Sequence, residues 1–461
     1  MAKGGALIAA GLLAAAVAGC ATAPARKPAI RIDEDPYRST YVRYPGAVTF
    51  IRGATVYDGE GGRLERGDVL IADGVVKAVE ANLMVPDGAV VIDGAGKFVT
   101  PGIIDVHSHL GDYPSPGVAS LSDGNEATAP ARPDVWAEHS VWPQDPGFSR
   151  ALANGGITVL QILPGSANLF GGRSVTLKNV PARTVQGMKF PGAPYGLKMA
   201  CGENPKRVYG NKGGPSTRMG NIATTRAVWI KAQAYKRKWD AYQKNGGEMP
   251  ERDLGMDTLR GVLAGKILVH NHCYRADEMA IMIDLAHEFG YKITAFHHAV
   301  ESYKIADLLA KEGICSAMWS DWWGFKMESF DGIKENISFV HNAGACAIVH
   351  SDDANGIQRL NQEAAKALAD GRRAGIAISD EVAWTWLSYN PAKALGIADR
   401  TGSLKPGKMA DVVLWNGNPF SNYTRPDKVW IDGALLYDSA NPRLRPVSDF
   451  ELGQPGEGDT K

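Results

Sequence analysis

The sequence predicts a (β/α)8 barrel joined to a small β-sandwich that is built from both ends of the chain. Short strands and tight turns occupy residues 46–97 and return at residues 401–440. Between them, over residues 98–400, strands alternate with helices, and repeated βα units argue for a parallel sheet. Polar clusters at His107 and Asp352 lie about 245 residues apart, close to the ~250 residues of a complete barrel.

The first twenty residues are expected to be an export signal. Lys3 supplies a positive charge, residues 4–17 are small and apolar, and the run ends in Val17-Ala18-Gly19-Cys20. This apolar run is shorter than the ~20 residues that a membrane-spanning helix needs. Its last four residues resemble a bacterial lipobox, which implies cleavage before Cys20 and a lipid anchor that holds a periplasmic protein at the outer membrane. Ordinary secretory cleavage near Ala21-Thr22-Ala23 is the alternative.

The two flanks of the barrel have the composition of turns and short strands. Residues 21–45, rich in proline and charge, are predicted to be a tether. Pairs such as Asp58-Gly59 and Asp73-Gly74 separate the strands of the first flank and favour hairpin turns. Beyond the second flank, residues 441–461 are predicted to be a tail.

The first barrel strand carries the most informative motif. An apolar run over residues 98–106 ends in His107-Ser108-His109. Because successive side chains of a strand point to opposite faces, His107 and His109 project from the same face. Two neighbouring imidazoles can bind one metal ion.

The clearest βα unit lies in the middle of the chain. Residues 266–272 form a predicted strand, and residues 276–289 form a predicted helix with apolar side chains at helical spacing. Gly290 stands where a C-terminal cap belongs. Strands at 292–298 and 314–319 continue the alternation.

Histidines collect at the ends of the predicted strands. Seven of the ten do so: His107, His109, His270, His272, His297, His298 and His350. Active sites of such barrels lie at the C-terminal ends of the strands. Imidazoles and carboxylates bind zinc and similar divalent ions, and a bound ion lowers the pKa of water from ~15.7 to about 7. The sequence therefore predicts a metal-dependent hydrolytic site.

The strand motifs resemble those of the amidohydrolase superfamily, in the branch related to imidazolonepropionase. The resemblance rests on the first-strand motif, on Val269-His270-Asn271-His272, on Phe296-His297-His298 and on Val349-His350-Ser351-Asp352. Both flanks also match, so it covers nearly the whole mature chain. It implies that the metal ligands are His107, His109, His272, His298 and Asp352.

The resemblance also implies further roles. Asp352 is expected to shuttle a proton, and His270 to orient His272 or contact the substrate. Because adjacent strand residues face opposite ways, only one of His297 and His298 is expected to point into the barrel mouth, and the resemblance favours His298. Asp353 is the alternative to Asp352, although the second carboxylate of such a pair more commonly caps a helix or lies in a solvated loop.

The fourth strand leaves two candidates for a bridging ligand. Binuclear relatives carry a carboxylated lysine here, and others use a glutamate. Lys198 stands inside an apolar strand, where an isolated ammonium is costly. Lys198 is favoured and Glu203, in the following loop, is the alternative. One or two ions, zinc above all, fit this set.

Two connections are expected to shape the pocket. Residues 112–145 form a long segment after the first strand, and residues 164–174 form a glycine-rich loop after the second. Arg173 and Lys178 are candidates for binding a substrate carboxylate, and a purely structural loop is the alternative. The basic stretch 231–244 is expected to be a solvated helix face.

Composition limits the classes of partner. Lysine plus arginine and aspartate plus glutamate number 50 each, which gives no support for a nucleic-acid partner. The cysteines beyond Cys20 show no short spacing and are expected to be buried thiols; they are Cys201, Cys273, Cys315 and Cys346.

The resulting prediction is a metal-dependent hydrolase that cleaves a C–N bond in an amide, cyclic amide or peptide-like small molecule. It would contact the membrane only through its anchor, and a homo-oligomer is compatible with the sequence. A metal-dependent deaminase is one alternative. A catalytically silent, lipid-anchored binding protein is another, and the intact set of candidate ligands speaks against it.

Overall fold

A computed structural model describes residues 1–2, 30–322 and 324–446. The predicted lipobox with Cys20, the first part of the predicted tether and residues 447–461 of the predicted tail lie outside the described residues. Among the described helices, none combines the length and the apolar character that crossing a membrane requires.

The barrel is an eight-stranded sheet whose strands neighbour one another in chain order. Its strands are β6 (Ile103–Ser108), β7 (Ile157–Ile162), β8 (Phe170–Lys178), β9 (Gly196–Ala200), β10 (Leu268–Cys273), β11 (Ala295–His298), β12 (Cys315–Met318) and β13 (Cys346–Val349). Just beyond β13, the backbone N–H of Asp352 donates to the carbonyl of His107 at 2.9 Å, which joins the last strand to the first. The predicted barrel is confirmed.

One strand departs from the expected βα repeat. β8 runs antiparallel to both β7 and β9, whereas the other neighbouring pairs are parallel. Residues 163–169 alone connect β7 to β8. A parallel crossover needs a dozen or more residues, so this short connection can only return the chain in the opposite direction. The predicted loop 164–174 is therefore half loop and half strand.

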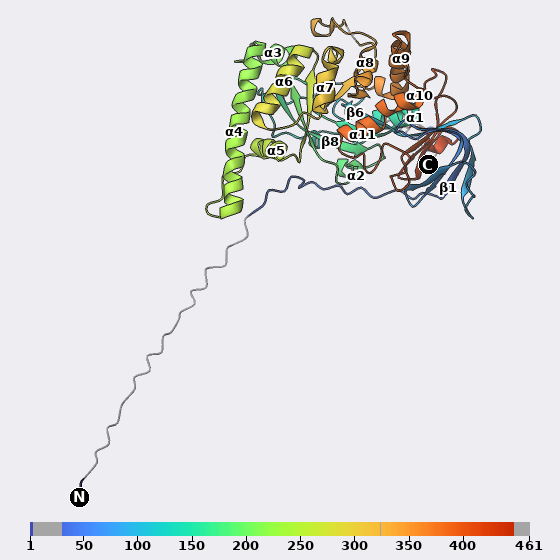
Figure 1. The fold of residues 1–461 in the computed structure, drawn as a ribbon, viewed down its shortest axis with the longest axis horizontal. Helices are drawn as coiled ribbons and strands as arrows, with labels where there is room; N and C mark the ends of the chain where they lie inside the picture. The colour runs from blue at the N-terminus through green and yellow to red at the C-terminus, as the bar shows by residue number, and fades with distance from the viewer. Residues whose placement is uncertain (3–29, 323, 447–461) are drawn as a thin grey trace.

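Helices cover the outside of the barrel (Figure 1). The longer ones are α1 (Pro146–Gly155), α4 (Arg218–Asn245), α5 (Leu254–Leu263), α6 (Ala276–Phe289) and α9 (Leu360–Arg373). Shorter ones are α2 (Val185–Met188), α3 (Glu203–Tyr209), α7 (Ala306–Glu312), α8 (Asn336–Asn342), α10 (Asp380–Ala383) and α11 (Tyr389–Ala394). α6 has the predicted bounds and ends at Gly290, whose φ of 74° is left-handed.

The second sheet contains strands from both ends of the chain, as the sequence predicts. Its N-terminal strands are β1 (Thr49–Tyr57), β2 (Arg63–Ala72), β3 (Val75–Glu80), β4 (Val90–Asp93) and β5 (Phe98–Pro101). Its C-terminal strands are β14 (Val412–Trp415), β15 (Pro426–Ile431) and β16 (Ala434–Asp438). The two groups meet where β14 pairs with β5. Residues of both groups, such as Val69 and Trp430, share one apolar core.

Residues 30–45, the described part of the predicted tether, lie against the body of the protein. They run from the sandwich beneath the barrel to the lower end of α4 (Figure 1). Glu34 pairs with Lys266 at 2.8 Å, Asp35 with Lys189 at 2.7 Å, and the Tyr41 hydroxyl donates to Asp432 at 2.6 Å. This stretch has no helix or strand, yet specific polar contacts hold it in place.

The four cysteines of the barrel form two disulfides, Cys201–Cys273 and Cys315–Cys346. The expectation of buried thiols is therefore wrong. Cys201 directly follows β9 and Cys273 ends β10, while Cys315 and Cys346 are register partners at the starts of β12 and β13. Each pair lies on neighbouring strands, a proximity that comes from the barrel and not from sequence spacing.

Candidate metal centre

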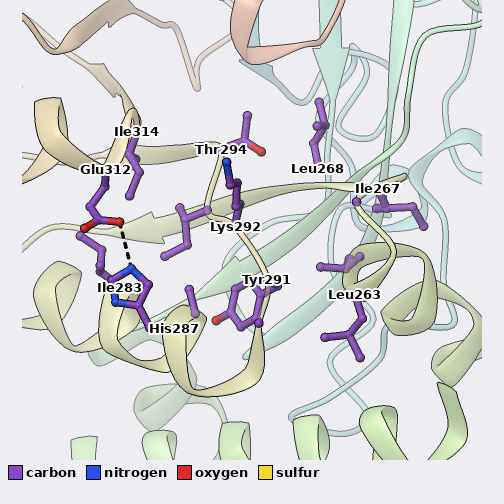
Figure 2. Close-up of a pocket in the computed structure, with 15 residues that line it drawn as sticks. Leu263, Ile267, Leu268, Ile283, His287, Tyr291, Lys292, Thr294, Glu312 and Ile314 are labelled. Carbon is purple, nitrogen blue, oxygen red and sulfur yellow. Dashed lines mark hydrogen bonds and ion pairs between the residues drawn. The ribbon is translucent and has the colours of Figure 1, made fainter. Parts of the chain in front are cut away.

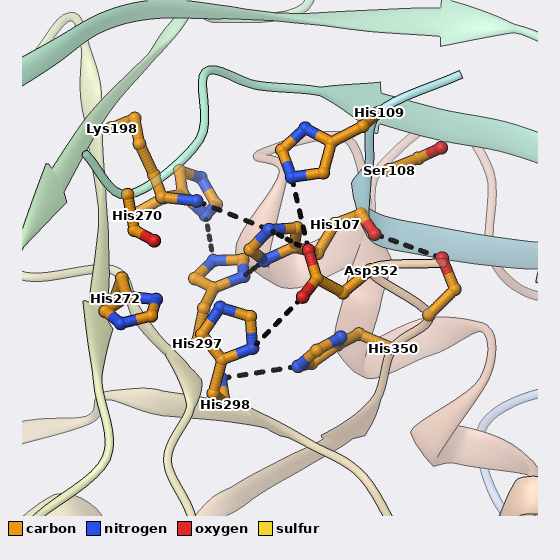
Figure 3. A network of polar contacts seen from close by, with 12 residues as sticks. His107, Ser108, His109, Lys198, His270, His272, His297, His298, His350 and Asp352 are labelled. Atoms are coloured by element: carbon orange, nitrogen blue, oxygen red, sulfur yellow. Dashed lines mark hydrogen bonds and ion pairs between the residues drawn. The ribbon is translucent and has the colours of Figure 1, made fainter. Parts of the chain in front are cut away.

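Polar side chains from five barrel strands converge at the C-terminal ends of those strands (Figure 3). β6, β9, β10, β11 and β13, with the residues just after them, supply His107, His109, Lys198, His270, His272, His297, His298, His350 and Asp352. Most of these side chains are fully buried, and the side chain of Asp352 keeps 27% of its surface exposed. The barrel therefore buries most of the cluster, and Asp352 is exposed to solvent at the barrel mouth.

One group of ligand atoms forms around Asp352. Its Oδ1 lies 3.2 Å from Nε2 of His107 and 3.2 Å from Nε2 of His109. The three atoms lie within 4.8 Å of one another, which is compatible with one shared cation. Asp352 has a left-handed φ of 60°, and its backbone bond to His107 holds it against β6. Strand alternation and this turn together aim the three side chains at one point.

A second pair of imidazoles faces Asp352 from β10 and β11. The rings of His272 and His298 lie 4.5 Å apart, and Nδ1 of His298 is 3.9 Å from Oδ2 of Asp352. Nε2 of His272 lies 3.5 Å from the amide nitrogen of Asn204. Asp352 thus lies between this pair and the two histidines of the first strand.

The structure brings Lys198, and not Glu203, into the cluster. Lys198 is fully buried on β9, with its Nζ 3.3 Å from Nε2 of His107. Burial lowers the pKa of Lys198 to about 7. Glu203 begins α3 and pairs with Lys326 at 3.6 Å.

His297 and His298 both lie in the cluster, so the expectation that only one of them points into the barrel is wrong. His298 and the following Ala299 have positive φ values of 71° and 38°. This backbone departs from the extended conformation, and strand alternation no longer applies at the end of β11. His297 contacts His107, with 2.8 Å between their Nδ1 atoms.

His270 lies deeper in the barrel than His272. Its Nδ1 is 2.8 Å from Nε2 of His297, and its side chain has no exposed surface. Its hydrogen-bonded partner is thus His297 and not His272, and the alternative role of contacting the substrate stays a prediction.

The chemistry of the donor set fits a divalent cation. Burial is the main cause that lowers the pKa of His107, His272 and His298 well below the ordinary value, so these rings are neutral and offer lone pairs. Nδ1 of His109, His272 and His350 has no hydrogen-bond partner among the described residues. Converging neutral imidazoles beside an aspartate are a donor set that zinc accepts.

Two residues of the site were not given a role by the sequence analysis. Asp105 Oδ1 accepts from the backbone N–H groups of His107 at 3.1 Å and Ser351 at 3.2 Å, so it ties β6 to the segment after β13. Burial raises the pKa of Asp105 to about 7. His350 forms a second compact group with His107 and His298. Their spacing in the sequence could have identified them, because residues two apart on a strand share a face. Asp105 is two residues before His107, and His350 is two residues before Asp352.

The predicted pocket residues have other contacts. The Arg173 guanidinium stacks on Trp136 at 3.9 Å and donates to Thr258 at 2.8 Å, while Lys178 pairs with Asp432 at 2.9 Å. Neither contacts the cluster. Asp353 accepts from the backbone N–H groups of Asn355 at 2.9 Å and Gly356 at 2.6 Å, in the turn that leads into the 3-10 helix Gly356–Arg359.

The segment 112–145 contributes to the mouth at one end. Tyr113 lies 5.7 Å from His109, ring to ring. A cavity of about 380 Å³ is lined in part by Asp112, Asp123 and Trp136 of this segment, together with Gly171.

A separate cavity lies away from this cluster. About 650 Å³ in volume, it is at the opposite ends of the barrel strands, where Leu268 begins β10 and Ile314 precedes β12 (Figure 2). Its polar contact is an ion pair of 2.9 Å between His287 and Glu312. None of the clustered histidines lines it.

Known proteins provide an independent comparison. A model of the Amidohydrolase family matches residues 266–436. The amidohydrolase tasK of Hapsidospora irregularis is 31% identical over 462 residues, covering 90% of this chain and 46% of tasK. The chain thus spans about half the length of that relative.

Solved structures agree with the sequence match. The crystal structure of an amidohydrolase from Thermotoga maritima is 38% identical, with a TM-score of 0.78, and the match covers 85% of this chain and all of that one. An adenosine deaminase from Xanthomonas campestris with bound zinc is 16% identical, with a TM-score of 0.50 over 87% of this chain and 94% of its own, which supports the fold alone. The identity across the whole Thermotoga chain, together with the family match, shows that this chain belongs to the amidohydrolase family.

Proposed function

We propose that the protein is a metal-dependent hydrolase that cleaves a C–N bond in an amide, cyclic amide or peptide-like small molecule. The observation that carries this proposal is the convergence of His107 Nε2 and His109 Nε2 on one oxygen of Asp352, each at 3.2 Å. Membership of the amidohydrolase family supports a hydrolase, and the donor set supports a cation at this point.

Two groups of side chains would hold the cation or cations, which we propose to be zinc. His107, His109 and Asp352 form one group, and His272 with His298 forms the other. When bound, a divalent cation supplies an activated water molecule and polarises the carbonyl under attack.

Lys198 has the properties of a residue that links the two groups. Its neutral amine could add to CO2, forming a carbamate and releasing one proton. The anionic carbamate would attract a cation beside His107, whereas the protonated form of the lysine would repel one. The low pKa of Lys198, about 7, makes the neutral amine available at neutral pH.

Asp352 is placed to move the proton of the reaction. Burial alone would raise its pKa, but the imidazoles of His298, His109 and His350 outweigh burial and hold the pKa below the ordinary value. The carboxylate is therefore ionised before the reaction and can accept a proton from the attacking water. It can then return that proton to the departing nitrogen, because general acid–base transfer needs only hydrogen-bond reach.

Elemental analysis combined with a panel of N-acyl amino acids, dipeptides and cyclic amides tests this function. We expect bound zinc and hydrolysis in the wild type, loss of zinc in His107→Ala, and a kcat lower by about 10²- to 10⁴-fold in Asp352→Asn. Asp353→Asn is the matched control and should keep full activity. A wild type without metal, or equal turnover in all variants, would refute the proposal. Release of ammonia instead of amine plus acid would indicate a deaminase.

We further propose that the protein is exported and anchored to the outer membrane through Cys20. The two disulfides support an oxidising compartment, since disulfides are rare in the cytosol. The wild type should label with palmitate and sediment with membranes, whereas Cys20→Ser should lose both properties. Thr22→Ser should behave as the wild type. Equal distribution of the wild type and Cys20→Ser would contradict the anchor.

A further inference from the structure

Three buried imidazoles form a continuous chain beneath the candidate metal centre (Figure 3). His107 Nδ1 lies 2.8 Å from His297 Nδ1, and His297 Nε2 lies 2.8 Å from His270 Nδ1. The three residues come from β6, β11 and β10, and their side chains have at most 1% exposed surface. Both ring nitrogens of His297 are thus used by other imidazoles.

Each of these contacts requires one ring to donate and the other to accept. Two arrangements satisfy both bonds. In one, protons sit on Nδ1 of His107, Nε2 of His297 and Nε2 of His270. In the other, every proton sits on the opposite ring nitrogen, and His107 is protonated at Nε2.

Only the first arrangement permits metal binding by His107. Its Nε2 faces Asp352 Oδ1 at 3.2 Å and Lys198 Nζ at 3.3 Å, on the side where the other ligand atoms converge. A nitrogen that carries a proton has no lone pair for a cation. Nδ1 of His107 must therefore donate, and His297 must accept.

The surroundings of His270, the last of the three imidazoles, are compatible with hydrogen bonds that are donated from His107 to His297 and from His297 to His270. Nε2 of His270 and Oε1 of Gln161 are both buried and without a hydrogen-bond partner among the described residues. Both side chains flank Gly196, where an added Cβ would come within 2.7 Å of the His270 ring and 3.1 Å of Nε2 of Gln161. A proton on His270 Nε2 thus lies in a region that contains a free acceptor.

We propose that His297 and His270 are positioning residues that hold His107 in the tautomer whose Nε2 lone pair faces the cation. This inference rests on the proposed metal-dependent function. Metal-binding histidines usually donate their second N–H to a carboxylate, a carbonyl or water. Here a neutral imidazole takes that place, itself oriented by another imidazole.

Zinc affinity tests the proposal without depending on turnover. Stripped protein is titrated with zinc against a chromophoric chelator. His297→Leu removes the acceptor and should weaken zinc binding by about 10- to 100-fold. His297→Gln keeps an acceptor oxygen and should recover most of that loss. His270→Leu should give a smaller loss, because it leaves the bond between His107 and His297 in place.

His341→Leu is the matched control, since His341 lies on α8 and its Nδ1 accepts from Trp386 at 3.2 Å. It should bind zinc as the wild type does. Wild-type affinity in folded His297→Leu would overturn the inference, and so would an equal loss in His297→Gln and His297→Leu. A wild type that binds no zinc would instead defeat the proposed function itself.

Histidine 15N NMR of the zinc-loaded wild type decides the matter even where a variant does not fold. The expected spectrum places the His107 proton on Nδ1 and leaves Nδ1 of His297 unprotonated. The opposite assignment for His297 would overturn the inference.

Discussion

Six imidazoles of the cluster are buried and neutral in the folded protein, whereas in the unfolded chain they are exposed to water and can bind protons. Burial lowers the pKa of His270 and His350 to about 3, and it lowers those of His107, His272, His297 and His298 well below the ordinary value. In the unfolded chain these rings titrate near 6.5. Below that pH the unfolded state binds protons that the metal-free folded state does not bind.

Acid should therefore destabilise the metal-free protein. Between pH 6.5 and 5.5, each imidazole that stays neutral lowers the free energy of unfolding by up to about 1.4 kcal/mol. Urea denaturation at pH 7.5, 6.5 and 5.5 measures the effect. His270→Gln should flatten the profile, whereas His287→Gln, on an exposed ring, should not. A free energy of unfolding that does not change over this range would contradict the account.

At the scale of elements, a disulfide joins the two strands that carry Lys198 and His272. Cys201 follows β9 and Cys273 ends β10, next to His272, and the bond closes a loop of 72 residues. Cys315–Cys346 closes 31 residues at the opposite ends of β12 and β13. The two bonds should therefore differ in their effect on the site.

Replacing Cys201 and Cys273 by serine should lower the free energy of unfolding by about 2–4 kcal/mol and accelerate zinc loss. The Cys315 and Cys346 double serine variant should lose stability to a similar extent but retain zinc as the wild type does. Thermal unfolding and zinc release to a chelator measure the two effects. Identical zinc release in both double variants would show that the first disulfide does not support the site.

At the scale of the whole molecule, one buried lysine joins the barrel to the sandwich. Lys178, at the end of β8, lies 2.9 Å from Asp432 and 3.6 Å from Asp411, and all three side chains are buried. Asp432 also accepts from Tyr41 in the N-terminal segment. Barrel, sandwich and N-terminal segment thus meet at Asp432, which forms an ion pair with Lys178 and accepts a hydrogen bond from Tyr41.

Lys178→Met should cost about 3–5 kcal/mol, because it leaves buried carboxylates without a cation. Lys304→Met is the control, since that lysine belongs to a partly exposed ion pair and should change stability by less than about 1 kcal/mol. Denaturant unfolding measures both. The surviving folded fraction of Lys178→Met should keep wild-type kcat, and a selective rise in KM would instead indicate a substrate contact.

Local patterns in the sequence by themselves determined the fold class and the edge of the barrel where the cluster forms. Alternation predicts that His107 and His109 share a face, and the structure brings both to Asp352. The helix at 276–289 likewise follows from its own spacing and its glycine cap. These are properties of neighbouring residues, so they can be derived without knowing the rest of the fold.

Contacts between distant residues decided the remainder. The direction of β8, the inward placement of His297, the two disulfides and the partner of Lys178 each depend on which strands become neighbours. The choice between Lys198 and Glu203 also depended on tertiary structure, because only the barrel shows that Lys198 reaches His107. The sequence pattern shows which face of a strand a side chain lies on. Which side chains it contacts on that face is determined only when the barrel closes and the strands become neighbours.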